Sequence, residues 1–450
     1  MHSFVMPRIK SDSEKILTAS DGSKSIIERK NQIMNNTAKI CKKCGRELPL
    51  DKFGINHNYT RSMCKECFNE GMREKRYQQR LSDGIETYHK DKSMKIQRKY
   101  KKPYHFQILY RSESGIDTIA KDEVFVRLFD YKSVWTSNYG RIIQRLNDGT
   151  YQLVKGVYSR ATKELTYTLD RNVYFKSKNR WGYRKEKVTA SDLVIQMFVV
   201  NYDMKHNTMV WHKNNDTKDN YYKHLFPVTD KQYNEILRVN EQDGTITDKQ
   251  IMEIVNAVEF KPDDWKPWHN KRTYEGVGYV GGDIDYESYS FIKWKNMIQR
   301  CYSDVVHKLK PYYMDKEVCI EWQNYQNFKI WFDAHYITGT KVDLDKDLLY
   351  KEGNIYSPET CAFMTHFLNT VFEDRGIESN IKQNDDGTYS VSMIVLNKKM
   401  DIGVFDSEEE AHTGFIDGKI DYICDLAEKC KDKVPDYVYE GMLNYKIEID

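Results

Sequence analysis

The chain has 450 residues, of which 40% are hydrophobic and 30% are charged, and its formal net charge is +3. This length is too great for one compact core, so we expect about three or four small domains. No run of about eighteen apolar residues is present, and the first twenty residues lack the apolar core of a signal peptide. These features argue against a membrane or secreted class, and we expect a soluble, cytoplasmic protein with no membrane partner.

Charge is distributed unevenly along the chain. Residues 1–110 carry 24 Lys or Arg against 12 Asp or Glu, whereas residues 401–450 carry 5 against 14. A basic front is typical of a module that binds nucleic-acid phosphates, because neutralised phosphates release counterions. The alternative is a solubilising tail. For the acidic carboxy-terminal region we expect a protein partner.

Two C-x-x-C pairs, Cys41 with Cys44 and Cys64 with Cys67, are separated by nineteen residues. This spacing is typical of a tetrahedral structural zinc site. The alternatives are redox chemistry and coincidental pairing. The other five cysteines are scattered singly, which does not suit a disulfide framework. We expect residues 1–37, which precede the knuckle, to be flexible.

A basic helical pattern follows the second pair of cysteines, and a second basic run extends from Lys90 to Lys102. Such an arm can lie along a phosphate backbone, so residues 38–110 are interpreted as a zinc knuckle with a DNA-binding arm. The alternative is a solvated linker helix. The basic residues assigned to DNA here are Arg73, Lys75, Arg76 and Arg80.

Residues 126–146 read VRLFDYKSVWTSNYGRIIQRL, and their turn at Asn138 to Gly140 favours two strands. This stretch resembles the small β module that precedes many HNH nucleases, and the matching positions include Arg141, which we assign to DNA. A helix is expected around residues 191–201, from the spacing of its apolar residues. Residues 111–240 are taken as this module plus an HNH-like unit.

The stretch MVWHKNNDTKDNYYKHLFPVTDKQYNEIL, from Met209, resembles the HNH motif of bacteriophage homing endonucleases. The resemblance implies a hairpin and a helix around one magnesium or manganese ion, with His212 as general base. It also implies that Asn234 or His224 lies near the metal, with His224 at the position of the residue that orients the base. Trp211 and Tyr233 depart from the motif, because they stand at positions where the family has metal ligands.

After a linker at 241–273, residues 274–375 contain helically spaced aromatic residues and resemble a second domain of such phage proteins. A hairpin followed by a helix is expected, with Asp345 and Asp347 on the first strand and Asn369 on the helix. These three form a second candidate metal site of oxygen ligands. The alternative is a surface turn that caps the helix.

Residues 376–450 contain two alternating strands, a turn at residues 397 and 398, and a Ser407/Glu410 capping box for a helix. They resemble the plant ethylene-response-factor type of DNA-binding domain, which implies that its sheet contacts the major groove. Lys398 and Lys399 are assigned to DNA. A protein-contact role is the alternative.

The predicted fold class is α+β and multidomain, with a zinc knuckle, ββα-metal units and a C-terminal three-stranded sheet plus helix. The resemblance implies a protein in the cytoplasm of a bacterial host that binds double-stranded DNA and hydrolyses it where the metal site is intact. The alternatives are an inactive DNA-binding regulator or subunit of a larger complex, and an interaction protein that binds no nucleic acid.

Overall fold

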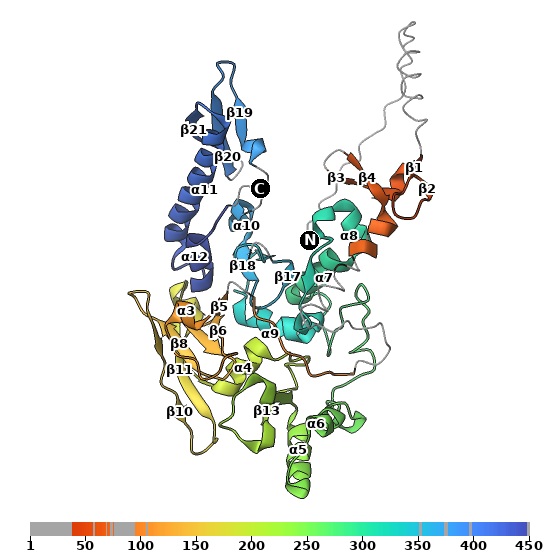
Figure 1. Cartoon of the computed structure of the whole chain (residues 1–450), viewed down its shortest axis with the longest axis vertical. Coiled ribbons are helices and arrows are strands. Elements are labelled where there is room, and N and C mark those ends of the chain that lie inside the picture. The colour runs from red at the N-terminus through yellow and green to blue at the C-terminus, as the bar shows by residue number, and fades with distance from the viewer. Residues whose placement is uncertain are drawn as a thin grey trace, which may run out of the picture. The chain divides into compact units, whose positions relative to one another are not determined.

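The computed structural model describes residues 38–56, 59–68, 70–72, 75, 95–104, 107–350, 353–372, 377–395 and 398–447. The chain divides into two compact units, residues 1–78 and 79–450, and Figure 1 draws the helices and strands of both. The segment 1–37, which was expected to be flexible, lies outside the described residues. Within the described ranges, no helix is both long and apolar enough to cross a membrane.

The first unit contains two short antiparallel hairpins, in which β1 pairs with β2 and β3 pairs with β4. Their bounds are Ala38–Ile40, Glu47–Pro49, Phe53–Asn56 and Tyr59–Cys64. Three cysteines and Phe53 are its buried core. A domain below about 40 residues usually needs a metal, a disulfide or a partner, and so small a core agrees with that rule.

A five-stranded antiparallel sheet opens the second unit, with its strands side by side in chain order. The turn from β7 to β8 contains Gly140 at φ 78°, in agreement with the predicted turn. A short helix, α3 (Arg111–Ser114), follows the first strand. The strands β5 to β9 span Ile108–Leu109, Phe125–Leu128, Val134–Ser137, Ile142–Arg145 and Tyr151–Leu153.

Three further strands, β10 (Val157–Tyr158), β11 (Leu165–Phe175) and β12 (Arg180–Thr189), form a second antiparallel sheet. Helix α4 (Ala190–Phe198) follows β12 directly. It begins where the Thr189 side chain accepts a hydrogen bond from a backbone N–H, as an N-cap residue does. The apolar face of α4 is buried in one core with side chains of both sheets.

The first ββα unit consists of the antiparallel pair β13 (Met209–His212) and β14 (Leu225–Val228), followed by helix α5 (Asp230–Asp243). Thr229 forms a capping box at the start of α5. The segment 241–273, interpreted as a linker from the sequence, contains helix α6 (Asp248–Val255). Since Ile251 of α6 is buried in the same core as Trp211, α6 completes this unit.

The second ββα unit stands on an aromatic core. Antiparallel β16 (Val342–Asp345) and β18 (Ala362–Thr365) precede helix α10 (His366–Phe372), so Asp347 lies just beyond the strand on which it was predicted. Trp294, Trp322 and Phe328 are completely buried in that core. The surrounding elements are α7 (Tyr289–Tyr302), α8 (Asp304–Leu309), α9 (Tyr325–His335) and the parallel pair β15 (Glu317–Val318) and β17 (Ile355–Tyr356).

The carboxy-terminal part is a three-stranded antiparallel sheet, β19 (Ile381–Gln383), β20 (Tyr389–Val395) and β21 (Lys398–Phe405), as predicted. The long helix α11 (Glu408–Cys430) packs on this sheet and leads to α12 (Asp436–Leu443). Its distal half packs with α12 against the second ββα unit.

Short 3-10 turns complete the mixed α and β architecture: Leu50–Lys52, Lys176–Lys178, Lys213–Asn215, Tyr222–His224, Val258–Phe260, Pro311–Tyr313, Glu321–Gln323 and Glu378–Asn380.

Candidate functional site

The four cysteines of the first unit converge. Cys41 and Cys44 lie in the turn between β1 and β2, Cys64 lies at the end of β4, and Cys67 lies in the helical segment that follows it. All four Sγ atoms are within 4.8 Å of one another. Four sulfurs at this separation match a tetrahedral metal site, so the cluster predicted from spacing can hold a metal ion.

Backbone and side-chain donors favour ionised sulfur on one side of the cluster. N–H groups of Cys44 and Cys64 lower the pKa of Cys41 to about 6. A hydrogen bond from the Arg46 side chain lowers the pKa of Cys44. Burial and the neighbouring sulfurs raise the pKa of Cys67. The raised pKa of Cys67 opposes its ionisation beside the other sulfurs, and a bound cation would offset that effect, which is the role of a structural metal.

The basic arm is described only in part. Arg73, Arg76 and Arg80 lie outside the described residues, and Lys75 is exposed. In the second basic run, Arg98 forms an ion pair with Asp248 at 2.7 Å, and Lys101 forms one with Glu321 at 2.9 Å. These two cations therefore hold the second unit together instead of facing solvent.

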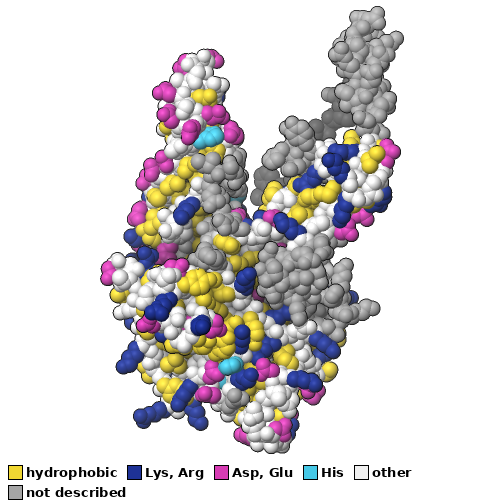
Figure 2. Space-filling model, viewed as in Figure 1, with side chains coloured by type: hydrophobic (Ala, Val, Ile, Leu, Met, Phe, Trp, Pro, Cys, Tyr) yellow, Lys and Arg dark blue, Asp and Glu magenta, His cyan; other side chains and the backbone are white. Residues whose placement is uncertain are grey.

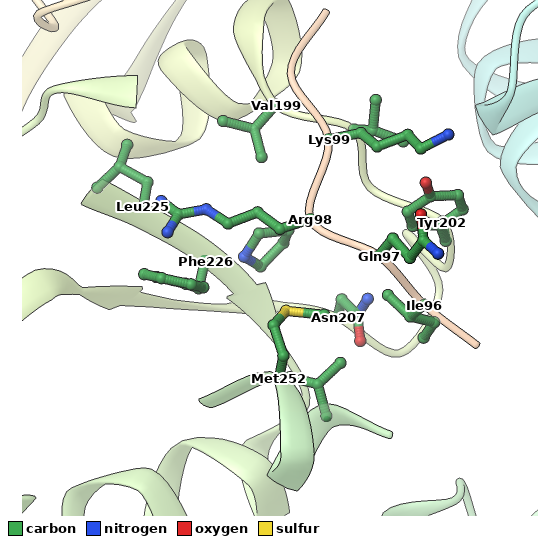
Figure 3. A pocket seen from close by; sticks show the side chains of 13 residues that line it. Ile96, Gln97, Arg98, Lys99, Val199, Tyr202, Asn207, Leu225, Phe226 and Met252 are labelled. Atoms are coloured by element: carbon green, nitrogen blue, oxygen red, sulfur yellow. The ribbon is translucent and has the colours of Figure 1, made fainter. Parts of the chain in front are cut away.

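A small cavity of about 30 Å³ lies beside Arg98 (Figure 3). Its lining residues come from the segment 96–99, from the chain after α4, from β14 and from α6. The Arg98 guanidinium lies 3.6 Å from the ring centre of Phe226, and two of its nitrogens are buried without a hydrogen-bond partner. A space of this size holds about one or two water molecules, so we assign the cavity to packing and hydration.

Trp211, in the first ββα unit, points into the core. It is completely buried, and its ring meets that of Tyr233 edge to face at 5.5 Å between centres. Both departures from the motif are thus packing residues. An indole supplies no lone pair to a hard cation, so position 211 cannot act as a metal ligand.

His212 is 4% exposed at the end of β13, and its Nε2 atom has no hydrogen-bond partner. Burial lowers its pKa, against a smaller opposite effect of a hydrogen bond with Asn220. The side chain is therefore neutral at pH 7, as a base must be. A neutral histidine is therefore present at this site, but the metal ligand expected at position 211 is not.

The other two residues assigned to this site have partners of their own. His224 Nδ1 lies 2.5 Å from a carboxylate oxygen of Asp219. Asn234 is exposed on α5, where its amide donates to the Asp230 carbonyl at 3.0 Å. No interaction among the described residues joins either side chain to His212.

The second candidate site is also occupied by local contacts. Asp345 is buried and accepts N–H bonds from Asp347 and Leu348, so it caps the turn after β16. Burial and, to a smaller extent, the Asp347 carboxylate raise its pKa to about 7. Lys346 forms an ion pair with Asp347. Asn369 is half-buried on α10, and no described contact joins it to the two aspartates.

A neighbouring pair was missed from the sequence. His366, the first residue of α10, lies with Nδ1 2.8 Å from Asp343 of β16, and Lys293 contacts the same carboxylate at 3.5 Å. The register Asp343 opposite Met364 brings the strand and the start of the helix together. Only the pairing of β16 with β18 reveals this, since 22 residues separate the two side chains.

A second cluster was also missed. Glu378, Glu408 and His412 have ligand atoms within 4.8 Å of one another, near the start of α11. The i to i+4 spacing of Glu408 and His412 on one helix was a readable signal. Among the described residues, only this group and the four cysteines bring together three or more His, Cys, Asp or Glu side chains in this way. Neither ββα unit contains such a group.

The remaining residues assigned to DNA differ in their surroundings. Both nitrogens that Arg141 presents to Glu123 are hydrogen-bonded, at 2.8 and 2.7 Å, and Glu123 is buried. Arg141 therefore stabilises the strand module through its contact with Glu123. Lys399 is exposed on β21 beside Asp401, at 3.2 Å, and Lys398 is the first residue of the same strand.

Comparison with known proteins identified no relative: no family model, curated protein or solved structure matches this chain.

Proposed function

We propose that this chain is a DNA-binding protein of the phage HNH homing endonuclease type, whose first ββα unit has kept its fold and lost its metal ligands. The observation that carries the proposal is the unit formed by β13, β14 and α5, with His212 at the end of its first strand. The buried Trp211 beside it supports loss of cutting at this site. Such a unit can still present a surface to duplex DNA.

Magnesium or manganese does not fit the first unit. These ions prefer carboxylate, carbonyl and water oxygens. Trp211 and Tyr233 instead pack against each other in the hydrophobic core, and the Asn234 amide donates a hydrogen bond to the Asp230 carbonyl of the same helix. No hydrolytic step is therefore assigned to His212.

We further propose zinc as the ion of the four-cysteine cluster. Thiolates favour zinc over hard cations, and a four-sulfur tetrahedron is closed to substrate. When bound, zinc would stabilise the fold of the first unit and supply no catalysis. The acidic residues 401–450, with three glutamates in the first turn of α11, suit a protein partner better than DNA.

The first experiment is a gel shift of the full chain on duplex DNA at low salt, run beside a plasmid-nicking assay with magnesium or manganese. We expect binding that weakens as salt rises, and the same absence of nicking in wild type and His212→Ala. Nicking that is lost in His212→Ala would contradict the proposed loss of cutting. Absence of binding in every sample would contradict the proposal as a whole.

The second candidate function is DNA hydrolysis at the second ββα unit. The contact between His366 and Asp343 favours it, because a carboxylate beside an imidazole is a common arrangement for a general base. The same nicking assay decides it. Activity that is lost in His366→Ala and kept in Asp345→Ala would support this function, and no nicking in wild type would exclude it.

A further inference from the structure

The segment 155–187, which contains β10, β11 and most of β12, is the most basic part of the second unit to which the sequence motifs assign no DNA contact. It carries ten Lys or Arg against three Asp or Glu. Figure 2 shows Lys and Arg side chains gathered on the part of the surface where Figure 1 draws β10 and β11. We call this segment the basic hairpin.

Nine of the ten basic side chains of the basic hairpin are exposed to solvent. The tenth, Arg171, is partly buried and forms ion pairs with Glu186 at 3.0 Å and Asp130 at 3.8 Å. Lys185 has one weak partner, Asp170 at 4.0 Å. The nine exposed residues are Lys155, Arg160, Lys163, Lys176, Lys178, Arg180, Arg184, Lys185 and Lys187. None of the other eight forms an ion pair with any described residue.

The pairing of the strands places Lys185 opposite Asp170, but it offers no carboxylate to Arg184. Arg171 of β11 lies directly opposite Arg184 of β12. Like charges on directly opposed residues destabilise a sheet, and self-repulsion opposes the folded state. The hairpin nevertheless keeps eight exposed cations that have no carboxylate partner in the described part of the chain. A polyanion along its length would remove that repulsion.

The dimensions of the basic hairpin suit a DNA duplex. Strand β11 has eleven residues, which extend over roughly 35 Å at about 3.3 Å each, and DNA rises about 3.4 Å per base pair. The charges lie at the tip, along β12 and beside β10, so they cover about one helical turn.

We propose that the basic hairpin is a binding element for double-stranded DNA, and that it contacts phosphates of the backbone. This inference rests on the proposed DNA-binding function and locates it on a surface distinct from the arm, Arg141 and the C-terminal sheet. Tyr183 on β12, with the Lys132 ammonium 4.9 Å from its ring centre, adds an aromatic contact beside the lysines.

The test compares DNA affinity at several salt concentrations for the full chain and two variants. The hairpin variant carries Lys176→Gln, Arg180→Gln, Arg184→Gln and Lys187→Gln. The matched control carries four substitutions at exposed lysines elsewhere in the second unit: Lys121→Gln, Lys295→Gln, Lys308→Gln and Lys310→Gln. Circular dichroism and a melting curve establish that both variants fold.

We expect the hairpin variant to bind at least about tenfold more weakly near 0.1 M salt. Its log-log salt slope should be reduced by about 0.9 for each DNA phosphate that the variant no longer neutralises. The control should weaken much less. Equal weakening in both variants, or none in the hairpin variant while wild type binds, would overturn this inference and leave the DNA-binding function standing. Wild-type protein that binds no DNA would overturn both.

Discussion

The Cys41 sulfur accepts the Cys64 N–H at 3.3 Å and lies within 4.8 Å of three other sulfurs. Replacing it by serine leaves a three-sulfur site with a hydroxyl that ionises poorly. We expect Cys41→Ser protein to lose its zinc, which atomic absorption would measure as a loss of about one ion per chain. The fold of the first unit should be lost as well, because structural zinc supplies the folding free energy of such modules.

Cys424→Ser is the matched control for that change. Cys424 lies on α11, outside the cluster, and it is only partly buried. This variant should keep its zinc and resist chelators as wild type does. Stoichiometric zinc in Cys41→Ser protein would show that the four sulfurs are not the site.

The sequence predicts the cysteine cluster, but it does not predict which side chains surround His212. The C-x-x-C spacing confined each sulfur pair to one turn, so convergence of the four was predictable. The surroundings of His212 were not, because Trp211 and Tyr233 meet only after a strand and a helix have packed. The pairing of Asp343 with His366 likewise depends on strand register.

At the scale of elements, the turn between β7 and β8 lies against the loop that carries Asn220. An added Cβ at Gly140 would lie 2.7 Å from the Asn220 Cβ, and the backbone there has φ 78°. We expect Gly140→Ala to lower the free energy of unfolding by about 3 kcal/mol, combining left-handed strain with overpacking. Urea unfolding of the full chain measures the loss.

Gly149→Ala separates strain from packing. Gly149 also has positive φ, at 87°, but its nearest neighbour would be an Arg145 nitrogen at 3.7 Å. This variant should lose only about 1 kcal/mol, the cost of the backbone conformation. Similar losses at the two positions would mean that the contact with Asn220 contributes nothing.

Hydrophobic periodicity predicted α4 and two strands of the C-terminal sheet, and the resemblance to the HNH motif implied the hairpin of the first ββα unit. The same periodicity did not identify α6, which was interpreted as part of a linker, because a helix of eight residues with one buried position gives little periodic hydrophobic signal. The second half of β12 contains four consecutive charged residues, Arg184 to Lys187, which give no alternation of apolar and polar side chains and therefore no strand signal.

At the scale of the whole second unit, polar contacts between distant segments hold its parts together. Asn327 of α9 is completely buried and donates to the carbonyls of Asn201 and Tyr202, both at 3.1 Å. Arg127 of β6 pairs with Glu440 of α12 at 3.3 Å. No local pattern encodes such contacts, since the partners lie more than 100 residues apart.

His335 of α9 makes another of these contacts and gives the molecule a pH dependence. Its Nδ1 donates to the Trp331 carbonyl at 2.7 Å, and Nε2 lies 2.8 Å from an Asp130 oxygen. Both nitrogens face acceptors, which favours the imidazolium form of the ring. Burial lowers the pKa of His335, but the Asp130 charge and the hydrogen bonds to Asp130 and Trp331 together outweigh burial, so the pKa is raised. Burial raises the pKa of Asp130, but the charge and hydrogen bond of His335 and the charge of Arg171 together outweigh burial, so the pKa is lowered.

A raised histidine pKa stabilises the fold fully below the ordinary value of 6.5, and the contribution is lost as pH rises through the folded pKa. A lowered aspartate pKa stabilises above 3.8 and is lost only as pH falls through the folded value. We therefore expect the unfolding free energy of wild type to fall as pH rises above about 6.5, and His335→Gln to reduce that slope; His206, whose pKa is also raised, contributes the remainder. At about pH 6 the variant should be less stable by about 3 kcal/mol, because the buried Asp130 carboxylate then keeps only the more distant Arg171 guanidinium, at 3.8 Å. His366→Gln, which removes a histidine that is 79% exposed, should keep the wild-type slope. Urea titrations at several pH values measure both, and a wild-type slope retained in His335→Gln would assign the pH dependence to another group.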